Sequence, residues 1–203
     1  MDPIESRLSP YLKSADESST TPKSRTLKPS TDKEVLVVDT LPMAESNIDE
    51  IMPIEETGFD NPYSPYGICE LLQDGKHFGL LAQNDNEEAV GYAIVEIRNN
   101  CLAIISLAVA EEHRGKMVGT QLVNMIVSLA RIRCKKIVET VIRESNKEAQ
   151  KFFVKQKFDL VKEAEKVYNI YPNEPACTYE RYMPQTGFPE DIWKGRDLRP
   201  SLN

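Results

Sequence analysis

The chain has 203 residues, of which 25 are basic and 32 acidic, and its net charge is −7. This length suits one domain with tails, and the acidic balance argues against a general nucleic-acid-binding protein. No apolar run approaches the roughly 18 residues of a membrane-spanning helix, and the first residues lack the apolar stretch of a secretory signal. We therefore expect a cytoplasmic protein that binds neither nucleic acid nor a membrane.

The cysteines are spread along the chain, and no two of them form a Cys-x-x-Cys pair. This spacing indicates neither a metal site nor a disulfide framework. Single cysteines within apolar segments are typical of small core residues. The four positions are Cys69, Cys101, Cys134 and Cys177.

The two ends of the chain differ in composition from its centre. Residues 1–33 are rich in Ser, Thr, Pro and Lys without an apolar period, which predicts a disordered polar leader. Residues 185–203 contain glycine and proline and predict a C-terminal tail, which Phe188 and Trp193 would anchor. The folded domain is therefore expected over 34–184.

The first half of this domain predicts one strand, two helices and three further strands. The β-branched run at 34–40 predicts the first strand. Ser46 is expected to cap a helix over 47–57, whose isoleucines at 48, 51 and 54 share one face. There follow a turn at 61–65, a helix over 66–73, and strands over 77–82, 89–97 and 101–109, the last two joined by a turn at Asn99-Asn100.

The second half alternates helices with strands. A helix is expected over 117–133, with a strand over 136–143 after it. Ser145 is expected to cap a helix over 146–156, and strands over 158–167 and 176–183 follow. The order of elements predicts an α/β fold with a mixed, mostly antiparallel sheet flanked by helices. The apolar stripe of the longer helix is formed by Val118, Leu122, Met125, Ile126, Leu129 and Ile132.

A strand that runs into a basic, glycine-containing loop and then a helix is found at 106–122. The backbone N–H groups at the start of such a helix favour a phosphate group. Gly115 and Gly119 permit a close approach to the backbone, while Arg114 and Lys116 add positive charge. This segment therefore predicts a phosphate-binding loop.

Three segments resemble the GCN5-related N-acetyltransferase (GNAT) family. The loop resembles the family's acyl-CoA pyrophosphate loop, [Arg/Gln]-x-x-Gly-x-[Gly/Ala], which Arg114 and Gly119 match. Residues 142–158 resemble the family segment Val-Arg-x-x-Asn-x-x-Ala-x-x-Leu-Tyr-x-x-x-Gly-Phe. Residues 54–64, together with 168–171, are similar to the ribosomal-protein-alanine N-acetyltransferase subgroup, whose members acetylate protein N-termini.

The resemblance covers about residues 35–184 and implies the GNAT fold, in which a central pair of strands splays apart. It implies acetyl-CoA as the cosubstrate and an amine acceptor, either a peptide N-terminus or a small amine, in a monomer or homodimer. The pantetheine arm would then pair with the strand edge at 107–109. The implied cofactor contacts are Leu107, Ala108, Val109, Arg114, Gly115, Lys116, Met117, Val118, Gly119, Thr120, Asn146 and Phe153.

The sequence departs from the family pattern at four positions. Met117 replaces a glycine of the loop, and we expect weaker CoA affinity, with a right-handed helical φ that lets the thioether point away. Lys157 replaces the glycine before Phe158, a change that concerns stability. Val141 and Phe153 stand where the subgroup carries a catalytic glutamate and tyrosine.

Acetyl transfer needs a base for the ammonium and an acid for the departing thiolate. Glu139 lies two residues before Val141 on the same face of its strand, about 7 Å further along, a gap that a water molecule can bridge. Tyr168 in the final loop carries a phenol. Glu139 and Tyr168 are therefore the predicted catalytic pair.

The predicted activity is acetyl-CoA-dependent N-acetylation of a primary amine by direct attack on the thioester. The preferred acceptor is a protein or peptide N-terminus. Two alternatives stay open: an acetyltransferase for a small-molecule amine or polyamine, and a catalytically weak acyl-CoA-binding module.

Overall fold

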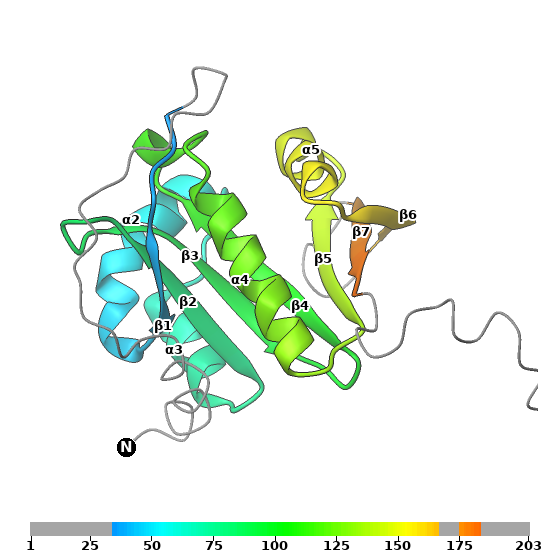
Figure 1. Cartoon of the computed structure of the whole chain (residues 1–203), viewed down its shortest axis with the longest axis horizontal. Helices are drawn as coiled ribbons and strands as arrows, with labels where there is room; N and C mark the ends of the chain where they lie inside the picture. The colour runs from blue at the N-terminus through cyan, green and yellow to red at the C-terminus, as the bar shows by residue number, and fades with distance from the viewer. Residues whose placement is uncertain (1–33, 167–174, 184–203) are drawn as a thin grey trace, which may run out of the picture.

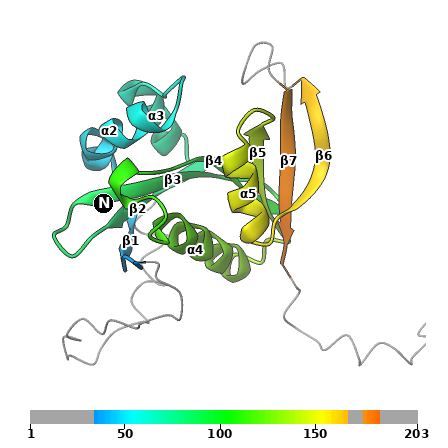
Figure 2. The same cartoon turned by 90° about the horizontal axis from the view of Figure 1, so that it is seen from above.

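The computed structural model describes residues 34–166 and 175–183. The predicted leader, the C-terminal tail and Tyr168 lie outside the described residues. Helices cover both faces of one sheet, as Figures 1 and 2 show. The strands are β1 (Asp39–Met43), β2 (His77–Gln83), β3 (Ala89–Ile97), β4 (Cys101–Val109), β5 (Ile137–Arg143), β6 (Asp159–Lys166) and β7 (Pro175–Tyr182). The helices are α2 (Ile48–Gly58), α3 (Pro65–Gln73), α4 (Val118–Ile132) and α5 (Lys147–Lys155), with 3-10 turns η2 (Glu45–Asn47) and η3 (Glu111–His113).

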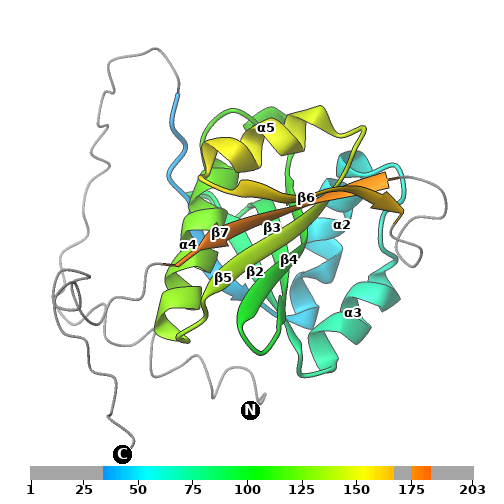
Figure 3. The same cartoon turned by 90° about the vertical axis from the view of Figure 1, so that its right-hand side faces the viewer.

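The sheet has seven strands in the order β1-β2-β3-β4-β5-β7-β6. Each neighbouring pair is antiparallel except β4 and β5, which run parallel and are connected through α4. Figure 3 looks onto β5, β7 and β6, which lie side by side. The predicted mixed, mostly antiparallel α/β fold is therefore confirmed.

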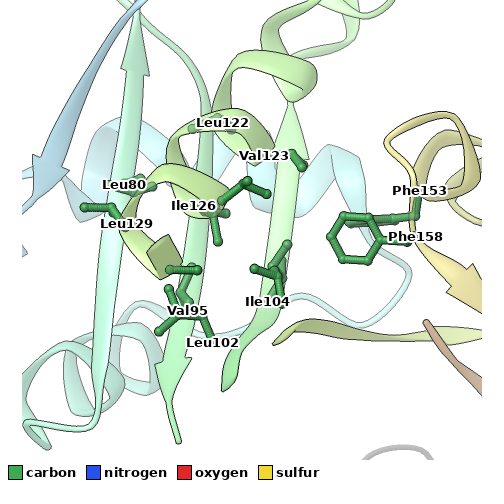
Figure 4. Packing of buried hydrophobic residues seen from close by; sticks show 14 of the residues in the cluster. Leu80, Val95, Leu102, Ile104, Leu122, Val123, Ile126, Leu129, Phe153 and Phe158 are labelled. Carbon is green, nitrogen blue, oxygen red and sulfur yellow. The ribbon is translucent and has the colours of Figure 1, made fainter. Parts of the chain in front are cut away.

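The sheet separates two buried apolar clusters. The larger cluster lies against α4 and α5 and includes Leu122, Ile126 and Phe153, seen in Figure 4. The smaller cluster lies against α2 and α3 and includes Ile51 and Ile68. Both helical layers bury one face only, as the 3.6-residue spacing of their apolar side chains requires.

The first strand was predicted five residues too early. β1 spans Asp39–Met43, whereas residues 34–38 are extended but pair with no strand. Leu36 and Val38 contact the cluster under α4, and Val37 is exposed. The β-branched run therefore indicated an extended segment correctly, but its backbone bonds to a different partner, described below.

Both predicted serine caps are wrong. Ser46 lies inside the 3-10 turn, where the Asn47 side chain accepts from the Ala44 N–H at 3.0 Å. Asn146, and not Ser145, caps α5, because its Oδ1 accepts from the Ala149 N–H at 3.0 Å. Asn47 is the N-cap residue of α2 but makes no side-chain cap bond, whereas Asn146 caps α5 in place of the neighbouring serine, and Asn is as good a cap as Ser.

None of the helices described in residues 34–166 is long and apolar enough to cross a membrane. Neither α2 nor α3, which are more apolar than α5, exceeds 11 residues.

We expect Ile126→Ala to lower the free energy of unfolding by about 2–5 kcal/mol, because it leaves a cavity in the larger cluster. Ile126 has no exposed surface, whereas Ile132 on the same helix is 49% exposed despite its place in the predicted stripe. Ile132→Ala is therefore the matched control, with an expected change within about 0.5 kcal/mol. Urea unfolding followed by circular dichroism measures both, and equal losses would contradict the packing described here.

Candidate functional site

β4 and β5 pair at only one end. Residues 101–104 lie opposite 137–140, and the two strands are not paired beyond this point. A bulge in β4 accompanies the separation, because Ile105 has no partner on β3 between two paired neighbours. Bulges bend a strand and increase its twist. The β5 side of residues 105–109 is therefore an open strand edge within the described part of the chain.

A cavity of about 350 Å³ occupies the gap between the two strands. Its walls come from the separating parts of β4 and β5, and its two ends come from opposite faces of the sheet. At one end lies α5, with its N-cap Asn146 and with Phe153 near its last turn; at the other lie Phe59 and Asp60, which follow α2. The volume falls in the range of small-ligand sites. The cavity is thus lined by residues that belong to helices on opposite faces of the sheet or that directly follow one.

The predicted phosphate loop connects β4 to α4. Gly115 has φ +78°, a conformation that favours glycine, and open space surrounds its Cα. A side chain at Gly119 would lie 3.3 Å from Phe152 Cζ, so this glycine lets α4 approach α5 closely. The loop thus ends on an N-terminal helix turn that is held near the cavity.

Met117 adopts a left-handed conformation, with φ 70° and ψ 5°, and is 43% exposed. The expectation of a right-handed φ is therefore wrong. Left-handed backbone costs a non-glycine residue about 1–2 kcal/mol. Met117 thus adopts a backbone conformation that usually favours glycine.

Residues 34–38, here called the strap, bond to the phosphate loop. Leu36 N–H donates to the Lys116 carbonyl at 3.0 Å, next to Met117. The Gln121 side chain donates to Leu36 O at 2.6 Å and accepts from Val38 N–H at 3.2 Å. These bonds hold the chain on both sides of the strained residue.

Three polar side chains of the loop already have protein partners. Arg114 Nε donates, at 3.1 Å, to the carbonyl oxygen of Val109, which is the last residue of the open edge. Lys116 Nζ lies 3.5 Å from a carboxylate oxygen of Glu34. Thr120 Oγ1 accepts from Gln156 Nε2 at 3.0 Å. An anion at this loop would therefore meet backbone N–H groups directly and these cations at its edge.

The predicted cofactor residues on β4 and α5 meet at the cavity. Leu107, Asn146 and Phe153 line it, while Ala108 and Val109 continue the same strand. Phe153 is buried and stacks edge-on with Phe152 and Phe158, with 5.1 Å between ring centroids in each pair. The cap bond of Asn146 uses its amide oxygen.

The predicted base lies away from this cavity. Glu139 pairs with Arg98 near the β3–β4 turn and is not among the lining residues. Val141 does line the cavity and is 40% exposed. The structure therefore does not bring Glu139 to the cavity wall, and Tyr168 lies outside the described residues.

A polar network under α2 was not predicted. Glu55, only 1% exposed, accepts from the Tyr92 hydroxyl through Oε2 and from the Tyr63 N–H at 2.7 Å through Oε1. Tyr92 OH is also 3.0 Å from Ser106 Oγ, and Ser106 lines the cavity. Burial, together with the hydrogen bond to Glu55, raises the pKa of Tyr92 far above its usual value. Tyr92 is therefore a neutral phenol at any physiological pH.

An ion pair reaches across the cavity mouth. Arg143 Nη1 lies 3.5 Å from Asp60 Oδ2, and the Asp60 side chain is 95% exposed. Both residues line the cavity. Pairs with one fully solvated partner contribute little to stability.

The sequence held a signal for only some of these groups. Asp60 directly precedes the turn expected at 61–65, and Glu55 lies within the helix expected over 47–57. Glu55 lies seven residues after Ile48 and four after Ile51, so helical spacing alone places it on the buried face of α2. Ser106 lies in the strand expected over 101–109, and neither its residue type nor its position there predicted a functional role.

Solved structures share this fold. The Escherichia coli ribosomal-protein-S18-alanine N-acetyltransferase is 15% identical, with a TM-score of 0.65 over 74% of this chain and 97% of that chain. Arabidopsis thaliana Naa50 in complex with the bisubstrate analogue CoA-Ac-MVNAL is 16% identical, with a TM-score of 0.60 over 72% and 99%. Nourseothricin acetyltransferase is 18% identical, with a TM-score of 0.58 over 72% and 99%.

Sequence comparison assigns the family. No curated protein sequence matches this chain. The sequence profile of the acetyltransferase (GNAT) family matches residues 45–158, which is more than half of the chain. The matched range includes the phosphate loop, the open edge of β4 and the start of α5. The chain therefore belongs to the GNAT family of acetyltransferases.

Proposed function

We propose that this protein transfers the acetyl group of acetyl-CoA to the N-terminal amine of a protein or peptide, as the ribosomal-protein-alanine N-acetyltransferase subgroup does. The observation that carries the proposal is the cavity between β4 and β5, which is lined from both faces of the sheet. A thioester that enters from the α5 side and an amine that enters from the α2 side would meet there. The proximity of the two reactants supplies a large part of the rate.

The cofactor would be held mainly by backbone groups. The first turn of α4 presents N–H groups to the pyrophosphate, with the favourable end of the helix dipole behind them. The open edge at 107–109 offers backbone donors and acceptors to the pantetheine arm, as an added strand would find them. Asn146 can donate from its amide nitrogen to the same arm, because its cap bond uses the oxygen.

Acetyl-CoA supplies an activated acyl carbon. The neutral amine attacks this carbon, the C–N bond forms, the C–S bond breaks, and the sulfur leaves as a thiolate that takes up a proton. No covalent enzyme intermediate is needed. A backbone N–H of β4 near Val109 would polarise the thioester carbonyl.

A peptide acceptor suits the surface at the α2 end of the cavity. Asp60 places a carboxylate at the mouth, which attracts a protonated amine. Tyr66, on the first turn of α3, is 72% exposed and offers a flat apolar face beside the loop. Among proteins of the same fold, Naa50 was solved with a peptide-containing analogue, which supports this proposal.

A small-molecule amine is the second candidate acceptor. Nourseothricin acetyltransferase has the same fold, so the fold does not favour one acceptor over the other. A non-catalytic acyl-CoA-binding role is the third candidate, since the side chains of Val141 and Phe153 can neither donate nor accept a proton. The three candidates differ in measurable ways.

We expect the protein to bind acetyl-CoA in calorimetry and to release CoA thiol faster with N-terminal peptides than with polyamines or aminoglycosides. Side chains beyond the first residue of a peptide would contact the loop after α2, whereas a polyamine would not. Faster release with small amines would favour the second candidate. Binding without thiol release would favour the third, and absence of binding at millimolar acetyl-CoA would contradict every enzymatic reading.

We expect Met117→Gly to lower the dissociation constant of CoA several-fold, because it removes a half-exposed side chain from the phosphate loop. It should also stabilise the fold by up to about 1 kcal/mol, because glycine adopts this φ without strain. Calorimetry with CoA and urea unfolding measure the two effects.

Lys157→Gly is the matched control for this change. Lys157 also has a positive φ, 65°, and also stands where the family pattern has glycine. It lies after α5 and does not line the cavity. We expect a similar gain in stability with unchanged CoA affinity, and an equal affinity gain in both variants would contradict a role for Met117 in the loop.

A further inference from the structure

We propose that Ser106, Tyr92 and Glu55 form a proton relay that carries a proton from the acceptor amine in the cavity to a buried carboxylate. This inference rests on the proposed acetyl transfer. It assigns the base of the reaction to Glu55 on α2, and not to a residue of β5, the strand that carries Val141.

The relay is continuous from the cavity wall to the carboxylate. Ser106 lines the cavity beside the bulge of β4. Its Oγ is 3.0 Å from Tyr92 OH, and Tyr92 OH is hydrogen-bonded to Glu55 Oε2. The three residues come from β4, β3 and α2, so the tertiary fold alone brings them together.

The direction of each hydrogen bond follows from the chemistry of the groups. An ionised carboxylate accepts only, so Tyr92 donates its proton to Glu55. The phenolic oxygen is then free to accept, and Ser106 donates to it. The lone pairs of Ser106 Oγ consequently remain for a donor in the cavity. An ammonium group is such a donor, and every bond in the chain is then oriented to move a proton inward.

Glu55 is held where it can accept this proton. Its second oxygen accepts from the Tyr63 N–H at 2.7 Å, which fixes the orientation of the carboxylate. The ionisable side chains that act on Tyr92 in the described structure are Glu55 from α2 and Tyr63 from the following loop. The nearest exposed carboxylate of the cavity, Asp60, is paired with Arg143.

The cavity has few other groups for this task. Val141 and Phe153 occupy the positions of the subgroup's glutamate and tyrosine, and Glu139 is paired with Arg98 away from the lining. Of the residues on β4 that line the cavity, only Ser106 carries a side-chain proton acceptor. Ser106 would touch the substrate and is the catalytic residue, whereas Tyr92 and Glu55 act through it as positioning residues.

The proton balance closes. The ammonium of the acceptor gives one proton to Ser106 Oγ, Ser106 passes its own proton to Tyr92, and Tyr92 passes its proton to Glu55. The neutral amine then attacks the thioester carbon, and the C–S bond breaks. The nitrogen gives its next proton to the departing thiolate. Glu55 returns its proton to water by the same path after the products leave.

The test compares Ser106→Ala, Ser106→Thr, Tyr92→Phe and Glu55→Gln with the wild type. Thiol release with a peptide acceptor is measured from pH 6 to pH 10, and the acetyl-CoA dissociation constant is measured by calorimetry. At pH 7 we expect Ser106→Ala and Tyr92→Phe to lower kcat/KM for the acceptor by about 10²-fold. Ser106→Thr keeps a hydroxyl and should retain most of the rate.

The pH profile separates a relay from a structural role. An N-terminal amine is mostly neutral above a pKa of about 8, so it then needs no base. The rate deficit of Ser106→Ala should therefore shrink towards pH 10, with acetyl-CoA affinity unchanged. A deficit that is constant with pH, or no deficit, would overturn the relay. So would a Ser106→Thr variant as slow as Ser106→Ala.

Ser128→Ala and Tyr182→Phe are the matched controls, because both residues are exposed and lie outside the cavity. Glu139→Gln tests the competing candidate for the base. A loss of kcat/KM that recovers at high pH in this variant, with Ser106→Ala unaffected, would assign the base to Glu139 and overturn the relay.

Failure of the relay can be told from failure of the proposed function. A wild-type protein that binds acetyl-CoA but releases no thiol with any amine would overturn both. An active wild type with unaffected Ser106→Ala and Glu55→Gln variants would overturn the relay alone. Because buried substitutions can unfold a protein, melting curves accompany each variant, and Ser106→Ala removes the fewest atoms.

Discussion

The separation of β4 from β5 after four paired residues is the constraint on which the rest of the site depends. A parallel pair that continued to residue 109 would satisfy its own backbone and leave no room between the strands. The unpaired residue at the bulge and the packing of α5 over β5 prevent this. The result is a strand edge inside the fold that pairs with no strand on its β5 side, and backbone groups in a protein interior call for a partner. An extended acyl carrier has the right shape and the right donors and acceptors for that row.

The phosphate loop is maintained by contacts outside its own motif. Two residues with positive φ, Met117 and Lys157, stand where glycine is usual, one at each helix next to the cavity. In the loop, the strap bonds to the residue before Met117, and Gln121 bonds to the strap after it. A left-handed residue is tolerated when its neighbours fix both sides of it. The chain therefore holds a left-handed backbone at this loop position with a residue other than glycine.

The fold could be predicted from sequence because its strands and helices have clear periods and follow a known order. The stripe of α4, the order of the elements and the three GNAT-like segments were sufficient for this. The site residues stay a prediction, and the sequence located them most directly where backbone position matters, as at the phosphate loop and the open edge. Side-chain pairing was less accessible: Glu139 pairs with Arg98 from the β3–β4 turn, and Glu55 accepts from the hydroxyl of Tyr92 on β3. Such partners are distant in sequence, so no local pattern encodes them. The role of the strap was hidden for the same reason.

The strap also fixes an order of events in synthesis. Its bonds join residues separated by 83 and 85 positions, so they cannot form until α4 has left the ribosome. Contacts of such long range are late to form in a folding chain, since a long loop must close first. The N-terminal segment of the domain is thus the first part made and among the last to dock. The phosphate loop reaches its final shape only when the strap has docked against it.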